Sequence, residues 1–343
     1  MHSEYGLQAR SEGKNQTFVK GLKTLFPDKI AIFSLDPEST RRRGGMCDVE
    51  ITIDYQSINV EDILSLQSEL NLHSTALEAA YLIASKHKKD WLQALLAYGH
   101  DAKEFAQQLG AHPESIAALY RKLKRIERLP FFVSRSAGAY KDQSVIDQMM
   151  EYIDKGISII IEFGNHTSTF IYLLIANIIT RRIHAQYIAK TEKFLGSQRS
   201  DEEPKKLMIT IEEAHKFLNA QAAAQTIFGI IARETRKYYV SLLVVDQRPS
   251  SIDEEIISQI GTKIVAQLND DKDIQAVLSG VNGAVNLRAI LATLDSKKQA
   301  LIMGHAVAMP IVVQTRDYDE KFYQAMQPKV TQEDIDQLIE KVF

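Results

Sequence analysis

The chain has 343 residues, 45% of them hydrophobic, which suits one large or two ordinary domains with a substantial buried core. Lys and Arg number 41 against 44 Asp and Glu, and this net charge of -3 excludes binding of nucleic acid or membranes through overall charge. The single Cys47 excludes an intrachain disulfide framework, and the apolar runs are too short to span a bilayer. We therefore expect a cytoplasmic protein without a membrane partner.

The first third of the sequence predicts two strands followed by helices. The strands are "KIAIFSL" and "DVEITIDY", separated by a loop that contains the arginines at residues 41–43. From about residue 60 to 130 the apolar residues recur at helical spacing and indicate an all-helical block. Within it, helices are expected to start at Ser74 and Pro113, and Gly99 is a helix stop.

After Gly156 apolar strands alternate with helices. The strands are "ISIIIEF", "LMITI", "YVSLLVVD", "KIVAQL", "QALIMG" and "PIVVQTR", and the helices between them include "TSTFIYLLIANIITRRIHAQYIAK" and "AAAQTIFGIIARETRK". Continuous apolar strands that alternate with helices are typical of a mostly parallel sheet covered by helices on both faces. The sequence therefore predicts an α/β fold.

Two adjacent carboxylates follow the strongest strand candidate, in "LMITIEEAHKF" at residues 207–217. Ligands of parallel sheets collect outside the carboxyl ends of the strands, where Glu212 and Glu213 stand. In nucleotide hydrolysis one such acid holds Mg²⁺ through its water shell and the next polarises the attacking water; we assign these roles to Glu212 and Glu213 respectively. The alternative is structural, because acids also cap the helix that follows them.

A basic cluster comes next in "ARETRKYYVSLLVVDQRPSS". Arg233, Arg236 and Lys237 recur at helical spacing and are expected on one face at the end of a helix, although cations there also complement the helix dipole. The following strand ends in Asp246-Gln247, where the amide of Gln247 can touch a γ-phosphate or the attacking water. Two neighbouring strands that both end in such groups favour a nucleotide site over packing.

These stretches carry a family resemblance. "IEEAH" followed by "ARETRKYYVSLLVVDQRPSSID" resembles the HerA branch of the HerA/FtsK superfamily of hexameric DNA-translocating ATPases, most strongly over residues 207–267, and "MHSEYG" is similar to a segment that follows the P-loop helix in that family. The resemblance implies a RecA-like core at residues 1–59 and 131–317. It further implies an inserted helical subdomain at 60–130 and a C-terminal helical tail at 318–343.

The resemblance also implies roles for single residues. Glu213 matches the catalytic glutamate, Glu212 the acid of the Mg²⁺ site, Gln247 a sensor and Arg233 a phosphate-sensing arginine. Glu212 stands where the family has Asp, which lengthens the metal ligand by one methylene group and leaves the metal geometry open.

Three further residues join the expected nucleotide-binding set, Arg236, Lys237 and His215, with His215 packing beneath the site and not binding metal. The sequence departs from the family pattern at two nearby positions. Thr235 replaces a glycine, and Asp246 replaces the threonine that precedes the sensor glutamine.

The largest departure is the missing phosphate loop. No G-x-x-x-x-G-K-[ST] sequence, whose backbone N–H groups wrap the phosphates, occurs in the chain. The nearest match, "EGKNQT" at residues 12–17, lacks the first glycine, a buried strand before it, and Ser or Thr after the lysine. If the resemblance holds, the P-loop is encoded upstream of Met1, and this chain alone is expected to hydrolyse ATP weakly or not at all.

Two functions are consistent with these residues. One is a subunit of a HerA-like ring ATPase, expected as a hexamer, that uses ATP and Mg²⁺ to translocate double-stranded DNA together with a nuclease or an effector of DNA repair or antiviral defence. The other is a ring scaffold or DNA-clamp module that has lost hydrolysis with its P-loop. A secretion or conjugation ATPase would need membrane-associated partners, to which no residue here points.

Two basic segments are left open between a DNA contact and a solvated surface. One is the arginine run at residues 41–43, for which a solvated loop is the preferred interpretation over a pore loop. The other is a predicted helix in the inserted block, with Arg121, Lys122, Lys124, Arg125 and Arg128.

Overall fold

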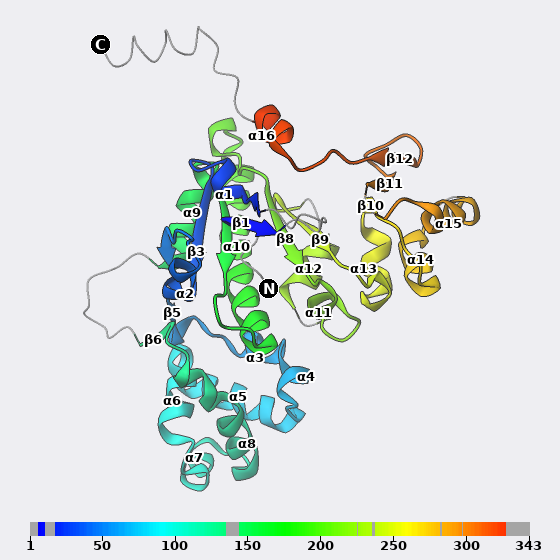
Figure 1. Cartoon of the computed structure of the whole chain (residues 1–343). Coiled ribbons are helices and arrows are strands. Elements are labelled where there is room, and N and C mark those ends of the chain that lie inside the picture. The colour runs from blue at the N-terminus through cyan, green and yellow to red at the C-terminus, as the bar shows by residue number, and fades with distance from the viewer. Residues whose placement is uncertain are drawn as a thin grey trace, which may run out of the picture.

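The computed structural model describes residues 6–10, 18–134, 144–224, 226–234, 237–281, 283–296 and 298–326. Its helices and strands form a mixed α/β protein, so the predicted α/β fold class is confirmed (Figure 1). Among these residues no helix combines the length and apolar character needed to cross a bilayer. The "EGKNQT" stretch, residues 1–5 of the "MHSEYG" motif and the C-terminal tail beyond Met326 lie outside the described residues.

The N-terminal strands build a small parallel sheet. Its order is β4-β3-β7, with β3 central and all five of its residues buried. The elements of this region are β1 (Gln8–Arg10), β2 (Phe18–Lys20), α1 (Leu22–Leu25), β3 (Ile30–Ser34), α2 (Pro37–Arg42), β4 (Val49–Glu50) and β7 (Ser158–Glu162).

The sequence predicted a loop at the arginine run of residues 41–43. The structure instead places Arg41 and Arg42 in α2, with Arg43 as its C-cap. Asp36 caps the N-terminus of α2 by accepting a hydrogen bond from the backbone N–H of Ser39. Pro37 occupies the first turn, where a backbone N–H would have no partner within the helix, so its missing N–H costs no hydrogen bond. These residues start a helix that runs to Arg42. The guanidinium of Arg43 then lies 3.4 Å from the buried carboxylate of Glu162 at the end of β7.

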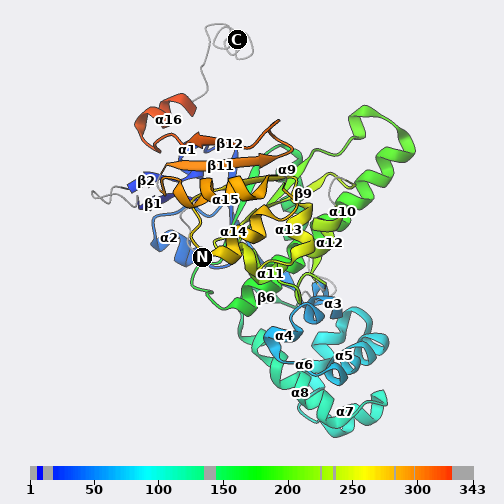
Figure 2. The same ribbon diagram turned by 90° about the vertical axis from the view of Figure 1, so that its right-hand side faces the viewer.

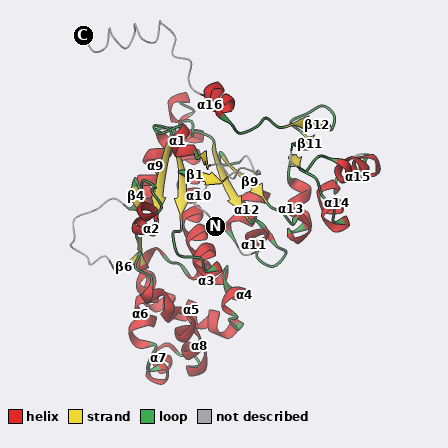
Figure 3. Ribbon diagram, viewed as in Figure 1, coloured by secondary structure: helices red, strands yellow, loops and turns green. Residues whose placement is uncertain are grey.

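The helical block predicted over residues 60–130 consists of helices throughout its described length, as the red ribbons of Figure 3 show. It enters and leaves the rest of the chain through the parallel pair β5 (Ile53–Asp54) and β6 (Phe132–Val133). Its elements are η2 (Tyr55–Ser57), α3 (Val60–Leu64), α4 (Gln67–Leu70), α5 (Ser74–His87), η3 (Lys88–Asp90), α6 (Trp91–Tyr98), α7 (Ala102–Leu109), α8 (Pro113–Leu123) and η4 (Lys124–Arg128). The expected helix starts at Ser74 and Pro113 and the stop at Gly99 are confirmed.

A long helix connects this block to the second parallel pair. α10 (Thr169–Ser197) spans 29 residues and contacts α3 and α4 of the block as well as α9 (Val145–Asp154), α12 (Ile227–Arg233) and η5 (Ser200–Glu202). The other elements here are β8 (Leu207–Glu212), α11 (His215–Leu218) and β9 (Val240–Val245). β8 and β9 pair in parallel from Leu207 with Val240 to Glu212 with Val245, so both strands end at the same edge.

Burial alternates along β8 and β9, as expected where helices cover one face of a sheet. The other face carries exposed Met208, Leu243 and Val245, with exposed fractions of 61%, 44% and 42%. The expectation of helices on both faces is therefore not met by the described residues around this strand pair. The strands also fall into separate small sheets and not into one continuous sheet.

The C-terminal part forms an antiparallel sheet with its own apolar core. The order is β10-β11-β12, with α14 and α15 contributing Leu278 and Leu291 to that core. The elements are η6 (Pro249–Ser251), α13 (Glu254–Gln259), β10 (Thr262–Val265), α14 (Asp271–Leu278), α15 (Ala284–Thr293), β11 (Gln299–Gly304), β12 (Ile311–Gln314) and α16 (Glu320–Met326). Figure 2 shows this sheet and the helical block at opposite ends of the molecule.

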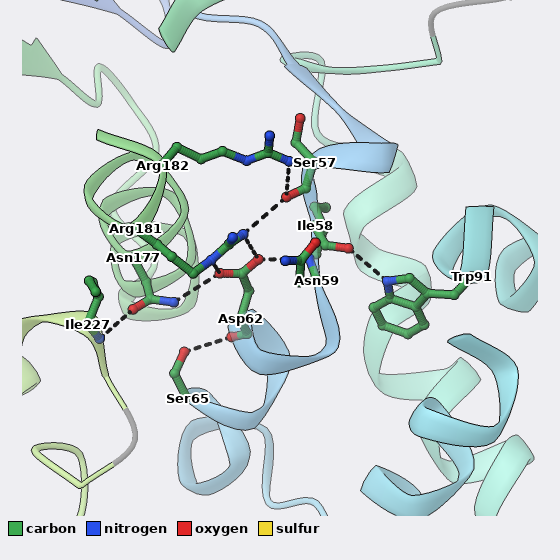
Figure 4. Close-up of polar contacts among 10 residues, drawn as sticks. All are labelled: Ser57, Ile58, Asn59, Asp62, Ser65, Trp91, Asn177, Arg181, Arg182 and Ile227. Atoms are coloured by element: carbon green, nitrogen blue, oxygen red, sulfur yellow. Dashed lines mark hydrogen bonds and ion pairs between the residues drawn. The ribbon is translucent and has the colours of Figure 1, made fainter. Parts of the chain in front are cut away.

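A buried polar network fixes the helical block to α10 and α12 (Figure 4). The fully buried carboxylate of Asp62 accepts hydrogen bonds from Nε and Nη2 of Arg181, at 2.9 and 2.7 Å, and from Asn177 at 3.1 Å. Burial raises the pKa of Asp62, while the hydrogen bonds and charge of Arg181 oppose that rise. Asn177 also accepts from the backbone N–H of Ile227, which ties the first residue of α12 into the same network.

Candidate active site

The turn after β8 holds Glu213 in a strained conformation. Its φ is 51°, in the left-handed region that residues other than glycine seldom adopt. The backbone N–H of Ala214 donates to the carbonyl oxygen of Val245 at 3.4 Å, which ties this turn to the end of β9. Strained non-glycine residues that the surrounding structure holds in place concentrate at functional sites, so this turn is the first candidate.

Asp246, directly after β9, organises the turn. Its Oδ2 accepts the backbone N–H of His215 at 2.7 Å and lies 2.8 Å from Nδ1 of the same ring, and its Oδ1 accepts the backbone N–H of Arg248 at 2.7 Å. The side chain is 3% exposed. Burial by itself would raise the pKa of Asp246, but these hydrogen bonds and the nearby imidazole lower it on balance.

The same contacts fix the protonation pattern of His215. Nη2 of Arg248 lies 2.8 Å from Nε2 of His215, and a guanidinium group has donors but no acceptor. Nε2 therefore accepts this bond, and Nδ1 carries the ring proton that is donated to Asp246. The side chain of His215 is 12% exposed, and its place beneath the acids stays a prediction.

The two acids differ in their surroundings. Glu213 is 40% exposed, with its Oε2 3.8 Å from Nζ of Lys216 and 3.9 Å from Nε2 of His215. The carbonyl oxygen of Glu212 accepts a 3.1 Å hydrogen bond from the phenol of Tyr172. Burial raises the pKa of that phenol, and the negative charges of Glu212 and Glu213 raise it further, so Tyr172 stays a donor. One acid thus faces solvent while the other is anchored through its backbone.

The structural alternative, in which the two acids cap the next helix, is not observed. The N-cap of α11 is Ala214, which makes no side-chain cap, and the first turn contains no acid. The carboxylate that meets the first backbone N–H of α11 belongs to Asp246.

Arg233 makes its contacts with α12, α13 and Ala223, and not with the turn after β8. It ends α12, and its Nη1 donates to the carbonyl oxygens of Ala223 and Gly229 at 3.1 and 3.5 Å. Its Nε lies 3.4 Å from Glu255 on α13. These contacts hold Arg233 at the junction of α12 and α13 and do not link it to Glu213.

The helix predicted to carry Arg233 and Lys237 on one face ends at Arg233, with Glu234 as its C-cap, so Lys237 lies beyond it. Lys237 follows the helix and is exposed, with its amino group 4.9 Å from the centre of the Tyr238 ring. Arg236 lies outside the described residues.

Gln247 is exposed and follows Asp246 at the end of β9, so it shares the strand edge with the acids. A cavity of about 290 Å³ adjoins α11, and His215 and Lys216 line it together with Ser65 of the helical block. Neither acid, nor Gln247, nor Arg233 lines that cavity. The structure therefore brings together Glu212, Glu213, His215 and the end of β9, without Arg233.

Sequence reasoning missed Asp246, Arg248 and Tyr172 as parts of the site. Asp246 had been noted only as a departure from a family threonine. One signal was available: parallel neighbours end at the same edge, so an acid after one strand faces a histidine after the other. Tyr172 gave no such signal, because it lies 40 residues before Glu212 within an ordinary apolar helix pattern.

The donor set limits which metal the site can hold. Within the part of the chain that the structure describes, no cluster of three or more His, Cys, Asp or Glu side chains can hold a metal by itself. Mg²⁺ is commonly bound by one or two carboxylates together with substrate phosphates and water. The single carboxylate of Glu212 fits that mode and not an all-protein metal cage.

Comparison with known proteins decides the family. The family model described as "Helicase HerA, central domain" matches residues 1–183, more than half of the chain. The chain belongs to this HerA family. The matched range ends before β8, so the roles assigned to Glu212, Glu213 and Gln247 do not come from this match.

Curated HerA relatives match over shorter stretches. The chain is 37% identical over 117 residues to the DNA double-strand break repair helicase HerA of Pyrococcus furiosus, covering 33% of this chain and 21% of the relative. It is 34% identical over 138 residues to the same-named helicase of Sulfurisphaera tokodaii, covering 38% and 28%. The matched region thus spans under a third of each of these HerA relatives.

Among solved structures, VirB4 of Thermoanaerobacter pseudethanolicus is similar over 86% of this chain and 83% of that chain. The sequence identity is 12% and the TM-score 0.47.

Proposed function

We propose that this HerA-family chain is a subunit of an ATPase that couples ATP hydrolysis to translocation of double-stranded DNA. The observation that carries the proposal is the strained Glu213 at the common edge of β8 and β9, beside Glu212 and above a histidine held in one tautomer. The names of the curated relatives support the DNA part of the proposal.

Glu213 is assigned to the attacking water. Its carboxylate is 40% exposed and therefore reachable by a substrate. Nζ of Lys216 lies 3.8 Å from its Oε2, and Nε2 of His215 lies 3.9 Å from the same oxygen. A carboxylate held in one place next to a bound phosphate can orient water and accept its proton.

Glu212 is assigned to Mg²⁺, which would supply charge neutralisation at the phosphates. Gln247, on the same edge, is assigned to sensing the γ-phosphate. Arg233, Arg236 and Lys237 keep their proposed nucleotide roles, although Arg233 is engaged at the α12–α13 junction within one chain. Any role of Arg233 at a nucleotide therefore requires a second chain or a rearrangement of α12.

We propose that the phosphates are bound mainly by a phosphate loop outside these 343 residues. No G-x-x-x-x-G-K-[ST] motif occurs among the 343 residues. We therefore expect this chain alone to turn over ATP weakly or not at all. Ring assembly, expected as a hexamer, and a nuclease or defence effector as partner belong to the same proposal.

A second candidate is a ring scaffold or DNA-clamp module without hydrolysis. Two observations agree with it: no G-x-x-x-x-G-K-[ST] motif occurs among these 343 residues, and Arg233 is engaged at the α12–α13 junction. The two candidates differ in one measurable property, which is ATP turnover that depends on Glu213.

The test is ATP turnover by the assembly purified through a tag on this chain. Glu213→Gln should lower kcat by roughly 10²–10⁴-fold, the usual contribution of a positioned general base. The control is Glu192→Gln, at an exposed position on α10, which should leave kcat unchanged. Equal turnover of the Glu213→Gln assembly and the wild type would support the scaffold. Strong turnover by the isolated chain would refute the proposal that this chain needs a phosphate loop from outside these 343 residues.

A further inference from the structure

The charges of the helical block are unevenly distributed. Residues 60–130 contain nine Lys and Arg and nine Asp and Glu, so the block carries no net charge. Five of those cations lie within the eight residues 121–128, with Glu127 as the single acid among them. We name these five the η4 basic surface: Arg121, Lys122, Lys124, Arg125 and Arg128.

Burial explains why these cations share one side. Leu119, Leu123 and Ile126 are 0% exposed and anchor the end of α8 and η4 on the core of the block. All five cations between and beyond them are exposed. Side chains three and four positions apart are neighbours on a helix, so the spacing of Arg121, Arg125 and Arg128 favours a row across the end of α8 and η4.

Two acids act on the η4 basic surface through their charge, Glu69 on Arg125 and Glu127 on Lys124, without forming an ion pair in the described part of the chain. No ion pair within 4 Å joins any of them to another residue that the structure describes, whereas exposed Arg199 and half-buried Lys190 each have a carboxylate partner. Lys124 donates only to the phenol of Tyr120. Arg121 and Lys122 complement the dipole at the end of α8, but Arg125 and Arg128 lie beyond it, so helix stability does not account for the row.

The surface adjoins the helix that supports the candidate active site. The guanidinium of Arg125 lies 3.6 Å from the centre of the Phe170 ring, in the first turn of α10. Tyr172, in the same turn, donates to Glu212. A polyanion bound at the η4 basic surface would therefore lie close to the element that anchors the acids.

We propose that the η4 basic surface binds the phosphate backbone of double-stranded DNA without sequence preference. The inference rests on the proposed function, which takes DNA as the substrate, and it names the surface that holds it. Unpaired arginines and lysines in a row match a phosphate backbone by charge. The surface includes no exposed aromatic side chain, which single-strand binding by base stacking would use.

The experiment measures binding of a fluorescently labelled duplex of mixed sequence to the full chain by anisotropy, over a range of salt concentrations. The variant is Arg121→Gln/Lys122→Gln/Arg128→Gln, which leaves Arg125 on Phe170 and Lys124 on Tyr120. The matched control removes three exposed cations elsewhere in the block, Lys88→Gln/Lys89→Gln/Lys103→Gln. Circular dichroism and thermal unfolding check that both variants fold like the wild type.

The surface variant should bind duplex roughly tenfold or more weakly, and its salt slope should fall by about 2–3, since each lost phosphate contact removes about 0.9. The control should bind like the wild type. Unchanged binding by the surface variant, or tighter binding of the single strand than of the duplex, would overturn this inference and leave the proposed function standing. A wild-type chain that binds no duplex even at low salt would overturn both.

Discussion

At the scale of single residues, the buried carboxylate of Asp246 determines how the candidate site is built. One oxygen receives both the backbone and the ring N–H of His215, so the turn after β8 and the orientation of the ring depend on a residue of the neighbouring strand. Hydrogen bonds to a charged group typically contribute about 1.5–3 kcal/mol. That stabilisation helps to offset the strain of Glu213 at positive φ.

His184 gives a prediction for the pH dependence of stability. It lies on α10, 5% exposed, with its ring 5.7 Å from that of Tyr238. Burial lowers the pKa of His184 below 6.5, and the charge of Glu234 only partly opposes this. The unfolded chain therefore binds a proton more readily, so the stabilisation is present above about pH 6.5 and is lost as the pH falls through the lowered pKa.

The measurement is the free energy of unfolding in urea between pH 7.5 and pH 5, for the wild type and for His184→Phe. The phenyl ring keeps the contact with Tyr238 but cannot take up a proton. The wild type should lose stability relative to this variant as the pH falls below 6.5. Parallel curves for the two proteins would contradict the assignment of a buried neutral His184.

At the scale of elements, the strands were predictable and some helix ends were not. β8 and β9 follow from apolar runs bounded by polar residues, and their shared edge follows from parallel pairing. The segment "ARETRK" favours a continuing helix by local propensity, yet α12 ends at Arg233. Arg233 bonds to Ala223 and Glu255, contacts from distant segments that no local pattern contains.

The packing of α12 gives a prediction with an internal control. A Cβ atom added at Gly229 would lie 1.8 Å from the carbonyl oxygen of Ala223, whereas one added at Gly196 in α10 meets nothing within 4 Å. Gly229→Ala should therefore destabilise the protein by about 1–3 kcal/mol, as overpacking does. Gly196→Ala should stabilise it by about 0.4–1 kcal/mol, because the unfolded chain loses conformational freedom.

Urea denaturation of the two glycine variants checks this pair of signs. Destabilisation by both substitutions would mean that α10 is not helical at Gly196. A neutral Gly229→Ala would mean that α12 does not pack on the segment around Ala223 as described.

At the scale of the whole molecule, the sequence predicted the order of the parts better than their assembly. The helical block, the alternating strands and the pair of acids could be read from periodicity and spacing. The link between block and core could not, because Asp62, Arg181 and Asn177 join across more than a hundred residues of sequence. The antiparallel arrangement of β10, β11 and β12 was likewise not encoded in any local pattern of the strands.

The parts of the candidate site differ in how far the sequence predicts them. Residues that follow neighbouring parallel strands, such as Glu213 and Asp246, can be expected together from sequence alone. Arg233 was assigned through a family motif, and its contacts within the chain lie at the α12–α13 junction. Its proposed role at a nucleotide therefore requires a second chain or a rearrangement of α12.

The central claim is that hydrolysis at the edge of β8 and β9 drives movement along double-stranded DNA. The direct measurement is ATP-dependent displacement of the third strand from a DNA triplex by the assembly that contains this chain. The wild type and the Glu192→Gln control should displace the strand at equal rates, and Glu213→Gln should abolish displacement while duplex binding persists. Displacement by the Glu213→Gln assembly at the wild-type rate would contradict the claim.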